Sequence, residues 1–158
     1  MSCSVSNFLR RQAPDCNCGS QSFRLVEMVN SLPGQPYRIL YVEDDLELLE
    51  SLSERLSMAG YEVDTASNGF RAVSMVGPRP DKYQLILTDV RMPGLDGYGV
   101  IEQARSAGYQ GAFIVYAASM TSDHRERLRE LRVQSVIEKP VPFSSLLATI
   151  REVQQAFP

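Results

Sequence analysis

The sequence predicts an α/β fold in which five parallel strands form one doubly wound sheet. From about Tyr37 onward, short apolar runs alternate five times with amphipathic segments, a pattern typical of parallel strands connected by helices. Several of the runs lack polar alternation, as strands do when helices cover both faces of a sheet. The 158 residues, 44% of them hydrophobic, are enough for one domain with a substantial core, preceded by an extension.

Each predicted strand is one of these apolar runs, and each predicted helix fills the interval after it. The strands are expected at residues 38–42, 61–65, 84–88, 112–116 and 135–137. The helices are expected at residues 45 or 46–59, 69–76, 98–107, 123–132 and 144–156. Boundaries read in this way are defined to about two to four residues.

Glycine and proline residues mark the ends of these helices. An apolar face identifies the first helix, formed by Leu48, Leu49, Leu52, Leu56 and Met58. Gly60 is placed to end that helix, and the second helix stops before Gly77 and Pro78. The third helix ends at Gly108, and the fifth begins after Pro142.

Residues 1–36 stand outside the alternation and are expected to form an extension that is either disordered or contains one short helix. Apolar residues at helical spacing favour the helix: Phe23, Val26, Met28, Val29 and Leu32. Residues 32–36, Leu-Pro-Gly-Gln-Pro, are typical of a hinge before a domain that covers 37–158. Because the last helix runs almost to Pro158, no output domain is expected after it.

Cysteine placement and net charge limit the class of function. All three cysteines, Cys3, Cys16 and Cys18, lie in the extension, so none can staple the domain, and free thiols suit a reducing, cytoplasmic compartment. A closed zinc site needs four ligands, and the chain has a single histidine, His124. The net charge of −3 argues against nucleic-acid or membrane-surface binding driven by net charge alone, so no direct nucleic-acid partner is expected. The apolar runs are too short for membrane insertion.

Acidic residues and one lysine follow the predicted strands. Glu43 and Asp44 come directly after the first strand, whereas Asp45 has a sufficient role as the N-cap of the next helix. Asp89 ends the third apolar run, and Lys139 follows the fifth strand. Because the carboxyl ends of parallel strands meet at one edge, these groups can form an oxygen site for Mg²⁺ whose negative charge the lysine offsets. The alternative is that the acids after the first strand are solvated loop residues.

The chain resembles the receiver domain of bacterial two-component response regulators in three motifs: Val42-Glu-Asp-Asp45, Asp89-Val-Arg-Met-Pro-Gly-Leu-Asp-Gly97 and Lys139-Pro140. The resemblance implies a flavodoxin-like fold in which Asp89 is the phosphoacceptor and Lys139 contacts the phosphoryl group. It also implies a Mg²⁺ site formed by Glu43, Asp44, Asp89 and the backbone carbonyl of Arg91. A histidine kinase or a histidine phosphotransfer protein would supply the phosphate, slow self-catalysed hydrolysis would remove it, and the signal would pass to a downstream protein.

Two positions depart from the family pattern. By its spacing from the other motifs, the hydroxyl residue usual after the fourth strand falls on Ala117, and the aromatic residue usual in the fifth strand falls on Val136. One neutral hydrogen bond contributes about 0.5–1.5 kcal/mol, too little to abolish phosphorylation but enough to alter its coupling to shape. We therefore expect an unusual readout, through Tyr116, Ser119 or the N-terminal extension.

Other classes of function stay open at this point. The first is a degenerate receiver that binds partners without phosphotransfer. The second is a phosphohydrolase with an aspartate nucleophile, which usually carries a second aspartate two residues on, where this chain has Arg91. The predicted helix 123–132 is rich in arginine, which is typical of a salt-bridged, solvated face and also suits an acidic partner.

Overall fold

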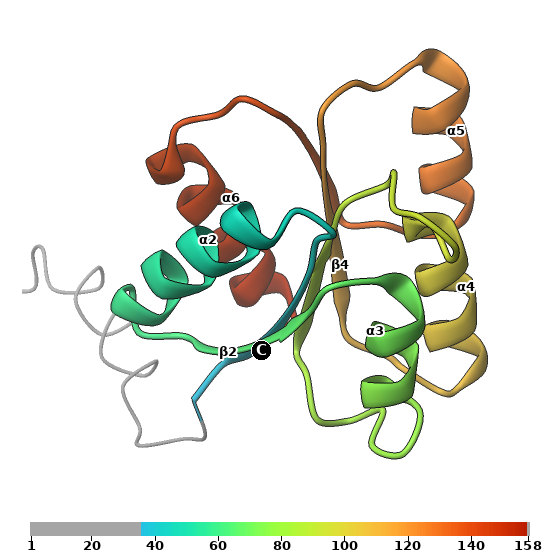
Figure 1. Cartoon of the computed structure of the whole chain (residues 1–158), viewed down its shortest axis with the longest axis horizontal. Helices are drawn as coiled ribbons and strands as arrows, with labels where there is room; N and C mark the ends of the chain where they lie inside the picture. Colours follow the sequence, from blue (N-terminus) through green and yellow to red (C-terminus); the bar gives the residue numbers. More distant parts are fainter. Residues whose placement is uncertain (1–35, 158) are drawn as a thin grey trace, which may run out of the picture. The chain divides into compact units, whose positions relative to one another are not determined.

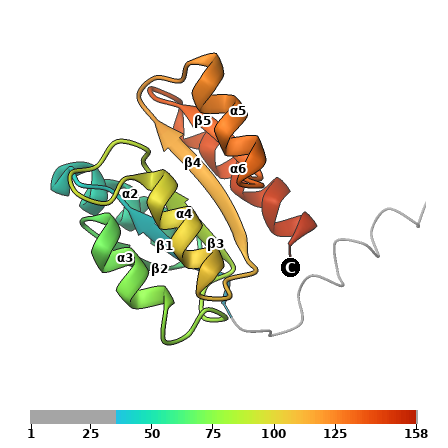
Figure 2. The ribbon, with the colours of Figure 1, turned by 90° about the vertical axis from the view of Figure 1, so that its right-hand side faces the viewer.

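The computed structural model describes residues 36–157, which form a parallel β-sheet covered by helices on both faces. The sheet has the strand order β2-β1-β3-β4-β5 (Figure 2). The strands are β1 (Arg38–Val42), β2 (Glu62–Ala66), β3 (Leu85–Thr88), β4 (Ala112–Ala117) and β5 (Ser135–Glu138). This confirms the predicted five-stranded, doubly wound fold. The expectations for residues 1–35 and for the three cysteines lie outside the described residues.

The helices divide into two layers. α2 (Leu46–Met58) and α6 (Phe143–Ala156) cover one face of the sheet (Figure 1). α3 (Gly69–Val76), α4 (Gly97–Ser106) and α5 (Ser122–Glu130) cover the other face. Within residues 36–157, no helix is long and apolar enough to cross a membrane.

Two hydrophobic cores lie on the two faces because side chains alternate along each strand. In β1, Tyr41 belongs to the core under α2 and α6, whereas Leu40 belongs to the core under α3, α4 and α5. Leu87 and Ile86 divide in the same way in β3. All four side chains are fully buried, so the central strands are apolar on both sides, as the lack of polar alternation predicts.

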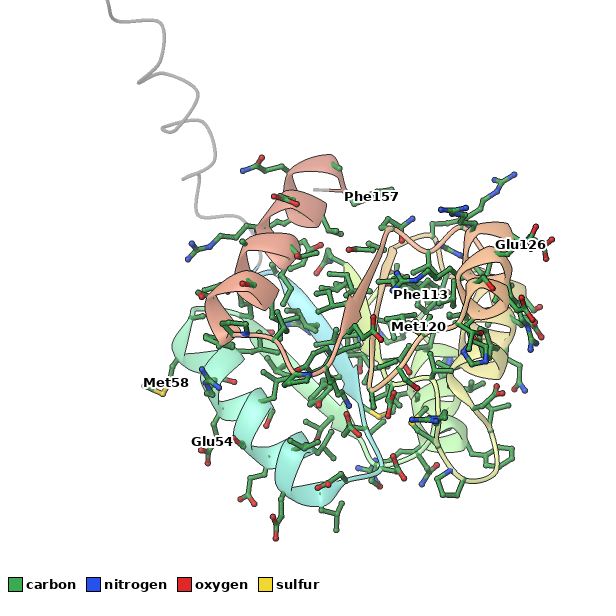
Figure 3. All side chains as sticks on the ribbon, turned by 90° about the horizontal axis from the view of Figure 1, so that it is seen from above. Glu54, Met58, Phe113, Met120, Glu126 and Phe157 are labelled. Carbon is green, nitrogen blue, oxygen red and sulfur yellow. The ribbon has the colours of Figure 1, made fainter. Side chains whose placement is uncertain are left out.

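The predicted boundaries agree with the observed ones to within two residues, but the apolar face of α2 is narrower than predicted. Leu49, Leu52 and Leu56 are buried against the sheet, as expected. Leu48 is 45% exposed and Met58 is 88% exposed, so assigning them to the packed face was wrong. Met58 points outward from the helix (Figure 3). It ends the helix on the solvent side, and an apolar pattern alone does not show how wide the contact with the sheet is.

Local capping interactions fix the chain where it leaves the sheet. The Asp45 carboxylate accepts hydrogen bonds from the backbone N–H groups of Glu47 and Leu48 at 3.0 and 3.1 Å, which confirms its role as the N-cap of α2. Gly60 adopts a φ of 97°, a left-handed conformation that favours glycine, directly after that helix ends. The helix therefore starts and stops where the sequence predicts.

The register of the strands brings three loops to one edge. Val42 pairs with Thr88, so the residues that follow β1 and β3 emerge side by side. Ala117 pairs with Glu138, and the backbone N–H of Lys139 donates to the Ala117 carbonyl at 2.8 Å. The ends of β1, β3 and β5 thus meet at the carboxyl edge of the sheet, where ligands bind in open α/β folds.

Candidate functional site

The carboxyl edge of the sheet holds a cluster of three carboxylates, which we call the acidic corner: Glu43, Asp44 and Asp89. Their nearest oxygen atoms all lie within 4.8 Å of one another. Glu43 and Asp44 follow β1, and Asp89 follows β3. The cluster brings together the three acids that the sequence nominates, and Asp45 is separated from them by its capping role.

Hydrogen bonds within its own loop fix the position of the Asp89 side chain. The Asp89 side chain accepts a hydrogen bond from the backbone N–H of Val90 through Oδ1 at 2.7 Å, and the residue is only 8% exposed. A backbone hydrogen bond closes this loop: the N–H of Gly97 donates to the Val90 carbonyl at 2.9 Å. A Cβ atom at Gly97 would collide with the carbonyl oxygen of Asp89, so glycine is required for this close approach. The second carboxylate oxygen, Oδ2, lies 3.6 Å from Nζ of Lys139.

Lys139 spans the corner and pairs most closely with Glu43. Its Nζ lies 2.6 Å from Oε2 of Glu43, and the two side chains are only 14% and 3% exposed. The Lys139–Pro140 peptide bond that follows is cis. Burial raises the pKa of Glu43, and the nearby Asp89 charge adds to this, although Lys139 acts in the opposite direction. The corner is therefore short of positive charge.

The residues present fit a hard divalent cation. Three carboxylates within 4.8 Å supply the oxygen ligands that Mg²⁺ prefers, and one lysine offsets only part of their charge. Asp44 is exposed and lines a cleft of about 490 Å³. Arg91, whose backbone carbonyl the family resemblance nominates as a ligand, also lines that cleft. The geometry of its carbonyl toward a cation stays a prediction.

The two departures from the family pattern lie where the sequence places them. Ala117 ends β4 next to Lys139 and is buried, and its methyl group offers no hydroxyl to the corner. Val136 lies in β5 and lines a groove against α5 together with Leu128 and Arg129. The charged groups that the sequence nominates thus meet at the acidic corner, whereas Ala117 and Val136 are neutral and apolar.

Two tyrosines also contact the groups of the corner, and the sequence motifs point to neither contact. The Tyr41 hydroxyl donates to Oε2 of Glu43 at 3.1 Å. The Tyr116 ring centroid lies 4.8 Å from Nζ of Lys139, within the range of a favourable cation–π contact. The sequence does carry a signal for Tyr41. Glu43 directly follows β1, and its backbone N–H still donates to the Ala66 carbonyl at 3.1 Å, so the alternation of the strand extends to it and places the two side chains on the same side.

The arginine-rich helix α5 forms ion pairs with its neighbours. Arg125 contacts Glu138 at 3.0 Å, and Arg127 contacts Glu102 at 3.2 Å. All four side chains are about half exposed, so each pair contributes little to stability. This arrangement fits the salt-bridged face that the sequence suggests. The acidic-partner hypothesis stays a prediction.

Comparison with known proteins identifies the family. Residues 39–151 match the family described as Response regulator receiver domain. SilR of Salmonella typhimurium, described as a probable transcriptional regulatory protein, is 35% identical over 114 residues, which are 72% of this chain and 49% of SilR. The transcriptional regulatory protein CusR of Escherichia coli K12 is 33% identical over 116 residues, with coverage of 72% and 49%. The chain therefore belongs to the response regulator receiver family.

A solved structure agrees with this assignment. The non-phosphorylated receiver domain of HemR from Leptospira biflexa matches with a TM-score of 0.69 and 31% sequence identity, covering 75% of this chain and 94% of that one. The chain spans about half the length of SilR and CusR. Both of those relatives are described as transcriptional regulators, so they do not support the expectation that nucleic acid is excluded as a partner.

Proposed function

We propose that the domain accepts a phosphoryl group on Asp89 with the help of Mg²⁺ and signals through protein interaction. The observation that carries this proposal is the acidic corner itself, where Glu43, Asp44 and Asp89 lie within 4.8 Å of one another with Lys139 across them. A structural ion pair needs one acid and one base. Three acids with one buried lysine leave uncompensated negative charge, which a bound cation would offset; the cation and Lys139 would then offer positive charge to an incoming phosphoryl group.

In the proposed reaction an Asp89 oxygen attacks the phosphorus atom of a phosphodonor. The new bond joins this oxygen to phosphorus, and the bond from phosphorus to the leaving group breaks with its electron pair on the leaving group. Lys139, already 3.6 Å from Oδ2 of Asp89, offers a point charge to the phosphoryl oxygens. Glu43, Asp44, Asp89 and the Arg91 carbonyl would hold Mg²⁺, which would neutralise charge that develops on those oxygens.

The same proposal includes the partners and the setting. The phosphodonor is a histidine kinase or a histidine phosphotransfer protein, and the acyl phosphate is lost by slow hydrolysis. We further propose that the receiver domain covers residues 37–158 after an extension of residues 1–36, and that the protein works in the cytoplasm. The downstream partner is a protein. An acidic partner would suit the exposed arginines of α5.

Intact-protein mass spectrometry after incubation with acetyl phosphate and MgCl₂ tests the chemistry. We expect one phosphate adduct on the wild type and none on Asp89→Asn. Asp123→Asn, which changes an exposed acid in the first turn of α5, is the matched control and keeps the adduct. If neither acetyl phosphate nor a panel of histidine kinases labels the wild type, the degenerate-receiver alternative replaces this proposal.

The readout of phosphorylation is a separate proposal, because Ala117 and Val136 lack the usual hydroxyl and aromatic groups. Tyr116 lies in β4 with its ring next to Lys139, and Ser119 follows that strand. These are the groups that we expect to respond. Hydrogen exchange of the phosphorylated and free forms should differ around residues 117–136 or in the N-terminal extension. An identical exchange pattern in both regions would exclude a readout through these segments.

A further inference from the structure

The Glu43 carboxylate makes both of its side-chain contacts through one oxygen. Nζ of Lys139 lies 2.6 Å from Oε2, and the Tyr41 hydroxyl donates to the same oxygen at 3.1 Å. An ionised carboxylate has about four lone-pair sites, two on each oxygen, so these two donors occupy the capacity of Oε2. The other oxygen, Oε1, is left for a cation.

Tyr41 is well suited to hold that arrangement. It is fully buried in the core under α2 and α6, so its ring has no freedom to leave. Its hydroxyl would lie unpaired in an apolar core without Glu43, and a buried unpaired hydroxyl is costly. Lys139, by contrast, is shared between Glu43 and Asp89. Of the two donors to Oε2, Tyr41 is therefore the one that serves Glu43 alone.

We propose that Tyr41 is a positioning residue that favours Mg²⁺ over Ca²⁺ at the acidic corner by limiting Glu43 to one ligating oxygen. Ca²⁺ takes about six to eight oxygen ligands and often binds carboxylates through both oxygens, whereas Mg²⁺ takes about six, keeps several waters and binds carboxylates through one. An Oε2 atom filled by two donors cannot join Oε1 in bidentate binding. This inference rests on the proposed cation site, and it adds that the site prefers Mg²⁺ to Ca²⁺.

Calorimetric titration of the whole chain with MgCl₂ and with CaCl₂ tests the proposal. Tyr41→Phe keeps the ring and removes only the hydroxyl, which frees one lone pair of Oε2. We expect the ratio of Ca²⁺ affinity to Mg²⁺ affinity to rise on the order of tenfold, as for the exchange of one hydrogen bond to a charged group. A purely structural role for Tyr41 would change the melting temperature and leave this ratio unchanged.

The chain contains a closely matched control. The Tyr83 hydroxyl donates at 2.8 Å to Oδ2 of Asp64, and Nζ of Lys82 lies 2.6 Å from that same oxygen. Tyr83→Phe therefore removes the same chemical contact from a carboxylate outside the acidic corner. Its Ca²⁺ to Mg²⁺ ratio should equal that of the wild type.

The possible outcomes separate this inference from the proposed function. If both cations bind and Tyr41→Phe leaves their ratio unchanged, the selectivity role is overturned while the cation site stands. If neither cation binds the wild type, the cation site fails and the inference fails with it. If Tyr41→Phe does not fold, the wild type alone can test the proposal. The NMR signal of the Tyr41 hydroxyl proton should persist at saturating Mg²⁺, and loss of that signal would overturn the proposal.

Discussion

Glu43 and Asp64 have the same two kinds of side-chain partner, yet their pKa values shift in opposite directions. Each has an oxygen 2.6 Å from a lysine Nζ, and that oxygen also accepts a tyrosine hydroxyl, at 3.1 Å for Glu43 and 2.8 Å for Asp64. Burial raises the pKa of Glu43 despite Lys139, whereas hydrogen bonding to Lys82 lowers the pKa of Asp64. The Glu43 side chain is 3% exposed, and the Asp64 side chain is 42% exposed.

The difference distinguishes a solvent-exposed ion pair from one that is buried beside another acid. Around Asp64, water and Lys82 together compensate the charge, and the cluster ties β2 to the segment before β3 at little cost. Around Glu43 water is nearly absent and a second acid, Asp89, adds to the negative charge. One lysine offsets only part of this buried charge, and the proposed cation would offset the rest.

Removing the two lysines should give the largest contrast. Lys139→Ala leaves a buried carboxylate without its main partner, so we expect the free energy of unfolding to fall by about 3 kcal/mol. Lys82→Ala should cost less than about 1 kcal/mol, because its partner is exposed. Urea unfolding followed by circular dichroism measures both. Equal losses in the two variants would show that burial does not distinguish the pairs.

Mg²⁺ should stabilise only one of the two clusters. At a concentration of about 100 times Kd, a ligand that binds only the folded state adds about 2.7 kcal/mol to the free energy of unfolding. We expect this gain in the wild type and in Asp64→Asn, and we expect most of it to be lost in Asp44→Asn. Urea unfolding with MgCl₂, against KCl at equal ionic strength, gives the values. A gain that Asp64→Asn abolishes would place the cation at the wrong cluster.

The stability contribution of Glu43 should depend on pH in a direction opposite to that of most acids. Its pKa is higher in the folded state, so the folded protein binds more protons between the ordinary glutamate pKa and the raised one. The contribution is therefore fully present below the ordinary pKa and is lost as pH rises through the raised pKa. Subtracting the free energy of unfolding of Glu43→Gln from that of the wild type at each pH isolates this contribution. If the wild type gained stability relative to the variant as pH rises, the raised pKa of Glu43 would be contradicted.

The fold and the charged residues of the acidic corner could be predicted from the sequence because both depend on local patterns. Apolar runs give the strands, and parallel strands deliver Asp44, Asp89 and Lys139 to one edge whatever the details of packing. The mistaken assignment of Leu48 and Met58 has the opposite origin. How much of a helix touches the sheet depends on the angle at which it packs, and no single helix encodes that angle.

The two tyrosine contacts could not be predicted with the same ease. Glu43 follows the strand of Tyr41 by one residue, so continued alternation puts them on one side. Only the fold shows that the hydroxyl reaches Oε2 and that Lys139 reaches it too. Tyr83 lies 19 residues from Asp64 and joins it through tertiary structure alone. The Tyr83 contact depends on strand order and side-chain reach, which leave no local signal.

The smallest effect we expect is the pH dependence of Asp64, and it should have the opposite sign to that of Glu43. The pKa of Asp64 is lower in the folded state, so its contribution is present above the ordinary aspartate pKa and is lost as pH falls through the lowered one. Because the side chain is 42% exposed, the whole contribution should stay below about 1 kcal/mol. Asp64→Asn measured beside Glu43→Gln gives the two slopes in one experiment. Slopes of the same sign would mean that the partners, and not burial, decide how these carboxylates behave.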